Sequence, residues 1–82
     1  MTNQPEDESL PTDIPGLEVA LAGLEERLAH SASTIRELME SEDPARGVFH
    51  AAAIHEAKQA HMVLRYRQDF CRARLARLRS QE

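Results

Sequence analysis

The stretch from His50 to Leu78 contains neither glycine nor proline and is rich in alanine, arginine and leucine. This composition predicts one long helix. At about 100° per residue, the apolar side chains of that helix fall on two sides rather than one. A surface helix normally buries a single apolar stripe, so this helix needs two neighbours, and the chain supplies only one other helix.

We expect the first side to pack inside the molecule and the second, here called the second stripe, to bind a partner protein. The first side comprises Ala53, Ile54, Ala57, Ala60, Leu64, Cys71, Leu75 and Leu78. The second stripe comprises Val48, Ala52, Val63, Tyr66 and Phe70, with Met62 at its edge. Left exposed, Tyr66 and Phe70 would form a contiguous patch of the kind that marks a binding surface. The alternative is that these are scattered surface apolar residues, which are common.

A preceding helix is predicted from about Pro15 to about Ser41. Asp13 is expected to cap its start, and Pro15 suits its first turn. Its apolar residues follow the spacing of a coiled-coil seam. They are Leu17, Leu21, Leu24, Leu28, Ile35 and Leu38. Ser31 takes the seam position between Leu28 and Ile35.

Between the helices, Ser41 to Pro44 forms the predicted turn. Asp43 followed by Pro44 is a helix-start signal, so the second helix is predicted from about Pro44 to about Arg79, with Gly47 tolerated in its first turn. It would be roughly two turns longer than the first helix. A short link makes the helices antiparallel neighbours. The expected fold is all-α: an antiparallel two-helix hairpin over residues 14–82, preceded by a flexible acidic tail over residues 1–13.

The net charge of −4 conceals two halves of opposite sign. Residues 1–43 carry eleven acids and two arginines, a net of −9, whereas residues 44–82 carry three acids and eight bases, a net of +5. The halves attract each other in a hairpin. Folding the chain back is expected to bring Arg72, Arg74, Arg77 and Arg79 near Glu18, Glu25 and Glu26.

No metal site, cofactor or catalytic group is predicted. His50 and His61 share a face but lie roughly 16 Å apart along the axis. His55 points elsewhere, and an antiparallel register places His30 near His61, which leaves too few ligands for zinc. Cys71 has cationic neighbours that would lower its pKa, but a small core residue is the favoured interpretation. No phosphate-binding loop, nucleophile triad or paired-carboxylate motif is present, so the chain is not expected to be an enzyme.

The composition also limits location and partners. A single cysteine precludes an internal disulfide, and no apolar run approaches the length of a membrane span. The acidic start does not resemble a secretory signal peptide, so a bacterial cytoplasm is expected. The run RYRQDFCRARLARLR is basic with aromatic residues interleaved, but an acidic chain does not favour nucleic-acid binding. A homodimer, in which two hairpins form a four-helix bundle, is an open alternative.

From Leu17 to Glu82 the chain resembles the small helical-hairpin co-chaperones of bacterial type III secretion systems. The resemblance rests on size, two antiparallel helices, a short polar turn and the stretch EAKQAHMVLRYRQDF, from Glu56 to Phe70. It implies a protein that binds a tetratricopeptide-like chaperone and helps to keep a needle subunit soluble before export. The second stripe would then dock on the helical-repeat partner.

The chain is also similar to the type III needle subunits, which are hairpins of about this size with an Asp-Pro in the turn, as in Asp43-Pro44. That resemblance implies self-assembly. The C-terminal helix of needle subunits commonly ends in an apolar segment, whereas this chain ends LARLRSQE. The departure favours the co-chaperone interpretation.

Overall fold

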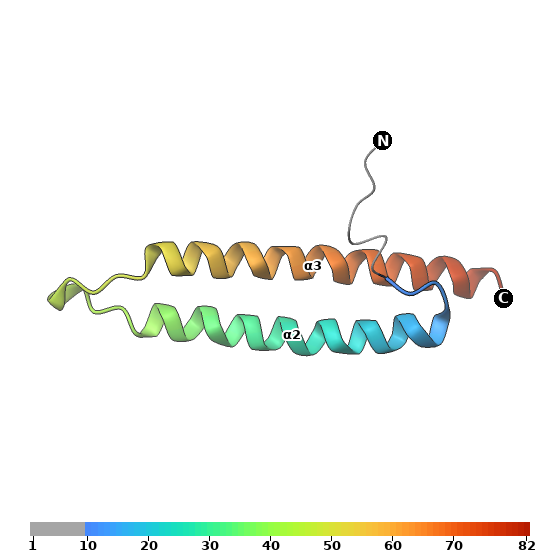
Figure 1. Cartoon of the computed structure of the whole chain (residues 1–82), viewed down its shortest axis with the longest axis horizontal. Helices are drawn as coiled ribbons and strands as arrows, with labels where there is room; N and C mark the ends of the chain where they lie inside the picture. The colour runs from blue at the N-terminus through green and yellow to red at the C-terminus, as the bar shows by residue number, and fades with distance from the viewer. Residues whose placement is uncertain (1–9) are drawn as a thin grey trace, which may run out of the picture.

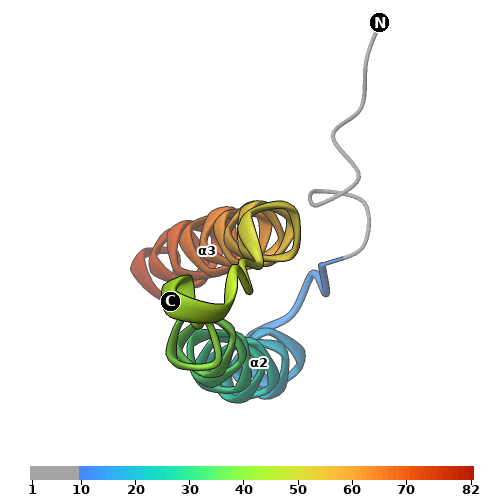
Figure 2. The same ribbon diagram turned by 90° about the vertical axis from the view of Figure 1, so that its left-hand side faces the viewer.

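The computed structural model describes residues 10–82 and confirms the predicted all-α antiparallel hairpin. Helix α2 (Ile14–Glu40) and helix α3 (Ala51–Ser80) lie side by side along their length, joined by a loop that contains the short 3-10 helix η1 (Pro44–Arg46) (Figure 1). The molecule is elongated, at 59 × 29 × 15 Å, and Figure 2 shows the helix pair nearly end-on. Most of the predicted acidic tail, residues 1–9, lies outside the described residues.

Helix α2 begins and ends within one residue of the predicted positions. The carbonyl of Asp13 accepts a hydrogen bond of 3.0 Å from the amide of Leu17, but the Asp13 side chain makes no capping bond in the described part of the chain. At the other end, the Ser41 amide donates to the Glu37 carbonyl at 3.0 Å. The helix start therefore depends on the backbone of Asp13 and on the fixed φ of the nearby proline rather than on a carboxylate cap.

The loop is longer than predicted, and the predicted start of the second helix at about Pro44 is wrong. Pro44 starts only one 3-10 turn, which ends at Gly47 in the left-handed conformation with φ 73°. Asp43 and Val48 then exchange two backbone hydrogen bonds of 2.8 Å each. Gly47 ends this turn because glycine adopts positive φ without steric cost.

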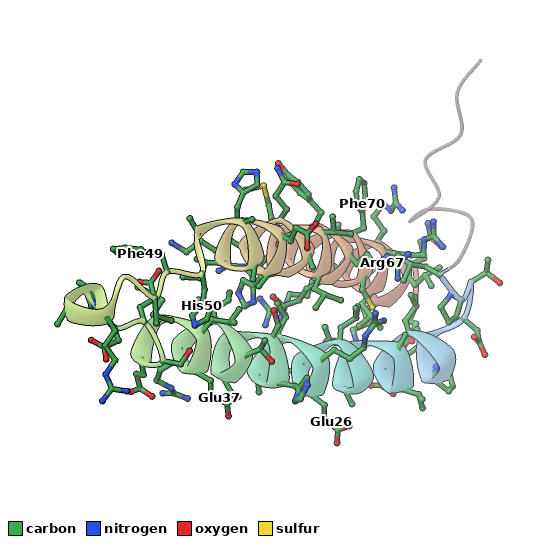
Figure 3. The ribbon with its side chains drawn as sticks, turned by 60° about the vertical axis from the view of Figure 1, so that its left-hand side comes forward. Glu26, Glu37, Phe49, His50, Arg67 and Phe70 are labelled. Atoms are coloured by element: carbon green, nitrogen blue, oxygen red, sulfur yellow. The ribbon has the colours of Figure 1, made fainter. Side chains whose placement is uncertain are left out.

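Helix α3 consequently begins at Ala51, seven residues later than predicted, and Phe49 and His50 lead into it (Figure 3). The amide of His50 donates to Glu42 Oε2 at 3.0 Å, which ties the end of the loop to its beginning. Helix α3 has 30 residues and α2 has 27, so the predicted excess of two turns is also wrong. Val48 lies in the loop and not on a helix face.

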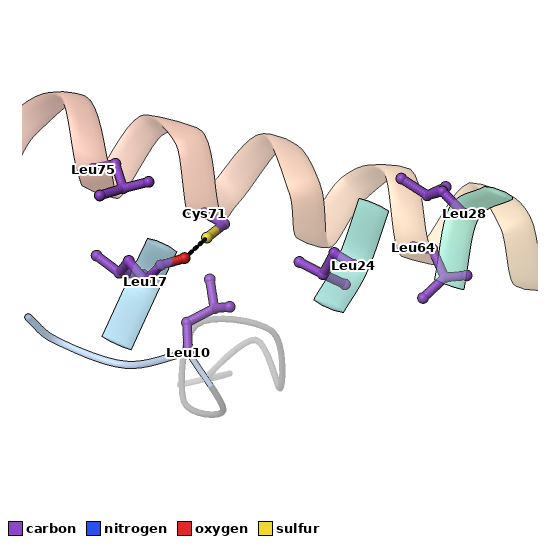
Figure 4. Packing of buried hydrophobic residues seen from close by; sticks show 7 residues of the cluster. All are labelled: Leu10, Leu17, Leu24, Leu28, Leu64, Cys71 and Leu75. Atoms are coloured by element: carbon purple, nitrogen blue, oxygen red, sulfur yellow. Dashed lines mark hydrogen bonds between the residues drawn. The ribbon is translucent and has the colours of Figure 1, made fainter. Parts of the chain in front are cut away.

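The buried core is concentrated at the end of the hairpin that is remote from the loop. Figure 4 shows its members, which are Leu10, Leu17, Leu24, Leu28, Leu64, Cys71 and Leu75. Leu21 and Leu78 are half-buried and pack against this cluster. Nearer the loop, four residues of the predicted seam are only partly buried. These are Ile35, Leu38, Ile54 and Ala57. Ala53 and Ala60 were predicted to pack inside on the same side of the helix, but they are exposed, so that part of the prediction is wrong. The seam thus becomes more open toward the loop.

At Leu10 and Pro11 the structure differs from the predicted flexible tail. Leu10 is 8% exposed and belongs to the core, and Arg74 of α3 donates to the carbonyls of Leu10 at 3.2 Å and of Pro11 at 3.0 Å. The chain therefore supplies part of the second neighbour that α3 was predicted to need.

Gly16 permits this close return of the chain. A Cβ atom on Gly16 would lie 2.8 Å from the Pro11 Cβ and 2.5 Å from Asp13 Oδ1, both closer than such atoms approach in proteins. A larger residue would displace the segment that carries Leu10, so the glycine is a requirement of the fold here.

Candidate protein-binding surface

A polar contact lies at the point along the seam where the burial of its apolar residues changes. Ser31 of α2 and His61 of α3 lie at the seam, with Ser31 Oγ and His61 Nδ1 3.1 Å apart. On the terminal side of this contact, Leu28 and Leu64 are buried, whereas on the loop side Ile35 is only half-buried. Burying this hydrogen-bonded pair costs less folding free energy than burying two unpaired polar groups would, but the pair contributes no apolar packing.

An open hollow of about 490 Å³ lies beside this part of the seam. Helix α2 contributes Ile35, and α3 contributes the other lining residues. They are Lys58, His61, Met62, Arg65, Tyr66 and Asp69. We call this hollow the groove. Its side chains combine an aliphatic, a thioether and an aromatic group with charged groups at the margin, which is a composition found at protein-binding surfaces.

Two residues of the second stripe, Met62 and Tyr66, line this groove. Met62 is 54% exposed and Tyr66 56% exposed. Val63, at 46%, and Ala52 are also exposed, but they do not line the groove. Val48 is exposed in the loop. The structure thus leaves most of the predicted partner-binding residues accessible to solvent while placing them in different parts of the surface.

Phe70 does not share this exposure. It is half-buried and packs against the core cluster, to which Leu10 also belongs. Within the helix, Phe70 stands between Arg67 and Arg74, and both of those residues lie near the returning Leu10–Pro11 segment. Phe70 is therefore less accessible than the other residues of the second stripe, and its partner-binding role stays a prediction.

Three large exposed apolar residues lie outside the predicted stripes. Phe49 is 63% exposed, Met39 51% and Val19 74%. Phe49 adjoins Val48 in the loop and Met39 lies at the end of α2, so two of the three are near the hairpin tip. Helical periodicity missed Phe49 because a helix was assumed from Pro44. The run Gly47-Val48-Phe49 was the available signal, since glycine followed by apolar residues is typical of a loop edge.

Cationic residues recur at intervals of seven along one edge of α3. They are Lys58, Arg65, Arg72 and Arg79. Residues seven apart lie on the same edge of a coiled-coil helix. Sequence reasoning missed this spacing because Arg67, Arg74 and Arg77 interrupt the run.

Only part of the predicted charge pairing is present. Arg79 Nη2 donates to Glu18 Oε2 at 2.7 Å, with both side chains 53% exposed. Glu25 and Glu26 make no ion pair within residues 10–82, and Glu26 points away from α3 (Figure 3). Because both side chains are half exposed, this contact contributes little to the stability of the hairpin.

The four histidines do not converge. His61 contacts Ser31, whereas His30 is exposed and lines another hollow, with Ala60 and Leu64. The described residues contain no group of three or more histidine, cysteine or carboxylate side chains that could hold a metal ion.

Cys71 is fully buried, and its Sγ donates to the Leu17 carbonyl at 3.3 Å. Burial raises the pKa of this thiol above its ordinary value, although the nearby Arg74 guanidinium acts in the opposite direction. The position agrees with the interpretation of Cys71 as a small core residue. The predicted lowering of its pKa by cationic neighbours is outweighed by desolvation.

No known protein family, characterised protein or solved structure matches the chain. Neither helix of the described region is long and apolar enough to cross a membrane.

Proposed function

We propose that this hairpin is a protein-binding module whose main contact surface is the groove. The observation that carries the proposal is the exposure of Met62 and Tyr66, each more than half exposed, on an open hollow beside a partly packed seam. Met and Tyr are enriched at the centres of protein interfaces. A partner lying in the groove would cover these side chains together with Ile35.

The shape of the molecule supports the same proposal. Its buried core is concentrated at the end remote from the loop, so that end is the better packed one. The loop end carries the exposed Val48 and Phe49 and the half-buried Leu38 and Ile54. A small helical domain that is incompletely packed at one end gains stability when a partner covers that end.

The test compares partner capture by the wild type and by a double variant, Met62→Ala with Tyr66→Ala. Capture from the native source is read by mass spectrometry. We expect the double variant to keep its helicity and to lose the partners that the wild type binds. Val19→Ala is the control, because Val19 is more exposed but lies outside the groove. Retention of the same partners by the double variant would contradict the proposal.

The narrower form of this proposal is a co-chaperone of a type III secretion needle subunit, acting in a bacterial cytoplasm together with a tetratricopeptide-like chaperone. Its support is the resemblance carried by Glu56 to Phe70, which spans the α3 side of the groove. Co-expression with a needle subunit and such a chaperone tests it. The expected result is a soluble complex that is lost in the Met62→Ala, Tyr66→Ala variant.

Sedimentation of the pure protein separates the competing proposals of self-assembly. A needle-like subunit would form fibres, and a homodimeric four-helix bundle would sediment as a stable dimer. A co-chaperone is expected to be monomeric or to aggregate when alone. The cationic edge of α3 is the one observation that favours nucleic-acid binding, and salt-dependent retention on DNA or RNA would test it.

A further inference from the structure

The Arg79–Glu18 ion pair joins one edge of α3 to one edge of α2. A step of seven from each residue reaches Arg72 and Glu25, which form no ion pair within the described residues. Nearer the middle of the hairpin, the Ser31–His61 contact gives the level at which the two helices lie opposite each other.

Two further steps of seven along α2 reach Ala32 and Met39, whereas two further steps along α3 reach Arg65 and Lys58. Neither Arg65 nor Lys58 forms an ion pair within the described residues. Both cations line the groove, so the groove holds two cationic side chains that no acid of α2 pairs.

The same stretch exposes apolar surface. Met62 and Tyr66 are more than half exposed, and Ile35 of α2, which lines the same groove, is half-buried. A chain segment that filled this groove would meet apolar side chains next to two cations, Lys58 and Arg65, with Asp69 as the one carboxylate of the lining. An α-helix with one apolar stripe and carboxylates beside it has the matching chemistry.

We propose that the groove binds an acidic amphipathic helix, which packs on Met62, Tyr66 and Ile35 and places carboxylates against Lys58 and Arg65. This inference rests on the proposed protein-binding function and specifies the partner's chemistry. The bound helix supplies carboxylates to Lys58 and Arg65 and lies as a third helix beside the middle of α3. Electrostatic complementarity of this kind selects partners more than it adds affinity.

The probes are two synthetic helical peptides of about four heptads with leucine at the seam positions. One carries glutamate beside the leucines and the other carries lysine at the same positions. Binding to the full chain is measured by titration calorimetry at low and at physiological salt. We expect the glutamate peptide to bind about tenfold more tightly than the lysine peptide, with a difference that shrinks as salt rises.

Two charge variants with the same change in net charge locate the effect. Lys58→Glu with Arg65→Glu should remove or reverse the preference for the glutamate peptide. Arg27→Glu with Arg77→Glu should leave it unchanged, because neither residue lines the groove. The Met62→Ala, Tyr66→Ala variant should bind neither peptide. A peptide that instead displaced α2 from α3 would still bind this variant, because neither side chain belongs to the buried seam.

Each outcome has a defined meaning. If both peptides bind equally and the Met62→Ala, Tyr66→Ala variant binds neither, the charge preference is overturned while the proposed protein-binding function stands. If neither peptide binds the wild type, or if Arg27→Glu with Arg77→Glu abolishes the preference as fully as the groove variant does, the acidic-helix proposal is wrong. Partner capture, which uses no peptide, then decides the proposed function separately.

Discussion

At the scale of single residues, Cys71 shows how closely the terminal half of the hairpin is packed. A thiol is small enough to let α3 approach the backbone of α2, and its Sγ donates to the Leu17 carbonyl at 3.3 Å. That carbonyl lies within α2 and also belongs to the helix's own hydrogen-bonding pattern. The side chain is fully buried, so the reactivity of its thiol toward reagents depends on opening of the hairpin.

We predict that a thiol reagent labels Cys71 much more slowly in the folded chain than in denaturant. Burial removes access, and the raised pKa lowers the thiolate fraction at every pH below the ordinary value of 9.0. The sign follows from linkage: a raised folded-state pKa stabilises the fold below the unfolded-state value, and this stability is lost as the pH rises through the folded-state value. Labelling rates measured across pH 7 to 10 by absorbance would check this. Folded-state labelling as fast as that of a free thiol would contradict the burial.

The gradient of burial along the seam gives a second prediction at this scale. Leu28→Ala removes a buried side chain and should lower the free energy of unfolding by roughly 2–4 kcal/mol. Leu38→Ala removes the same atoms from a half-buried position, and we expect about half that loss. Urea denaturation followed by circular dichroism measures both. Equal losses would mean that the loop half of the seam is packed as tightly as the terminal half.

At the scale of the elements, the sequence predicted the helices well and the loop poorly. The leucine spacing of α2 identifies a helix because a period of 3.5 recurs over its whole length. The loop failed because Asp43-Pro44 starts a 3-10 turn as readily as an α-helix, and Gly47 was read as a tolerated residue instead of a terminator. Whether a glycine ends a turn depends on its φ, which a pattern of residue types does not contain.

The candidate surface was predictable to the extent that it depends on α3 alone. Met62 and Tyr66 were selected by helical periodicity, and both are exposed. Phe70 was selected by the same argument but is half-buried, because the pattern of one helix contains no information on where Leu10 returns. The cationic edge is a spacing of seven within α3, which the intervening arginines obscure, and its contact with α2 through the Arg79–Glu18 ion pair appears only in the structure.

The two glycines of α2 should respond to alanine in opposite directions. A Cβ on Gly23 meets nothing within 4 Å, so Gly23→Ala should stabilise the chain by up to about 1 kcal/mol through helix propensity and reduced entropy of the unfolded chain. Gly16→Ala would force the new methyl group against Pro11 and should destabilise it. Thermal and urea denaturation of the two variants are the measurement. Stabilisation by both would show that the segment before α2 does not pack as described.

At the scale of the whole molecule, the two ends of the hairpin differ in how well they are packed. Its terminal end holds most of the buried core and the bonds from Arg74 to the Leu10–Pro11 backbone, the groove lies beside the middle of α3, and the loop end holds the exposed Val48 and Phe49. Local stability follows burial, so backbone amides of the terminal half should exchange with solvent more slowly than those near the loop. A molecule organised in this way keeps one end folded while the other end adapts to a partner.

This difference in packing depends on Leu10, which closes the terminal core from outside the two helices. Leu10→Ala should lower the free energy of unfolding by roughly 2–4 kcal/mol, as for Leu28→Ala, because a side chain that is 8% exposed loses most of its apolar contact. The same change should speed the labelling of Cys71, since both residues belong to one cluster. Thr12→Ala is the matched control, because Thr12 is exposed in the same segment and should change neither quantity. If Leu10→Ala left stability and labelling at the wild-type values, the Leu10–Pro11 segment would contribute nothing to the fold, and α3 would lack a neighbour along its terminal half as well as beside the groove.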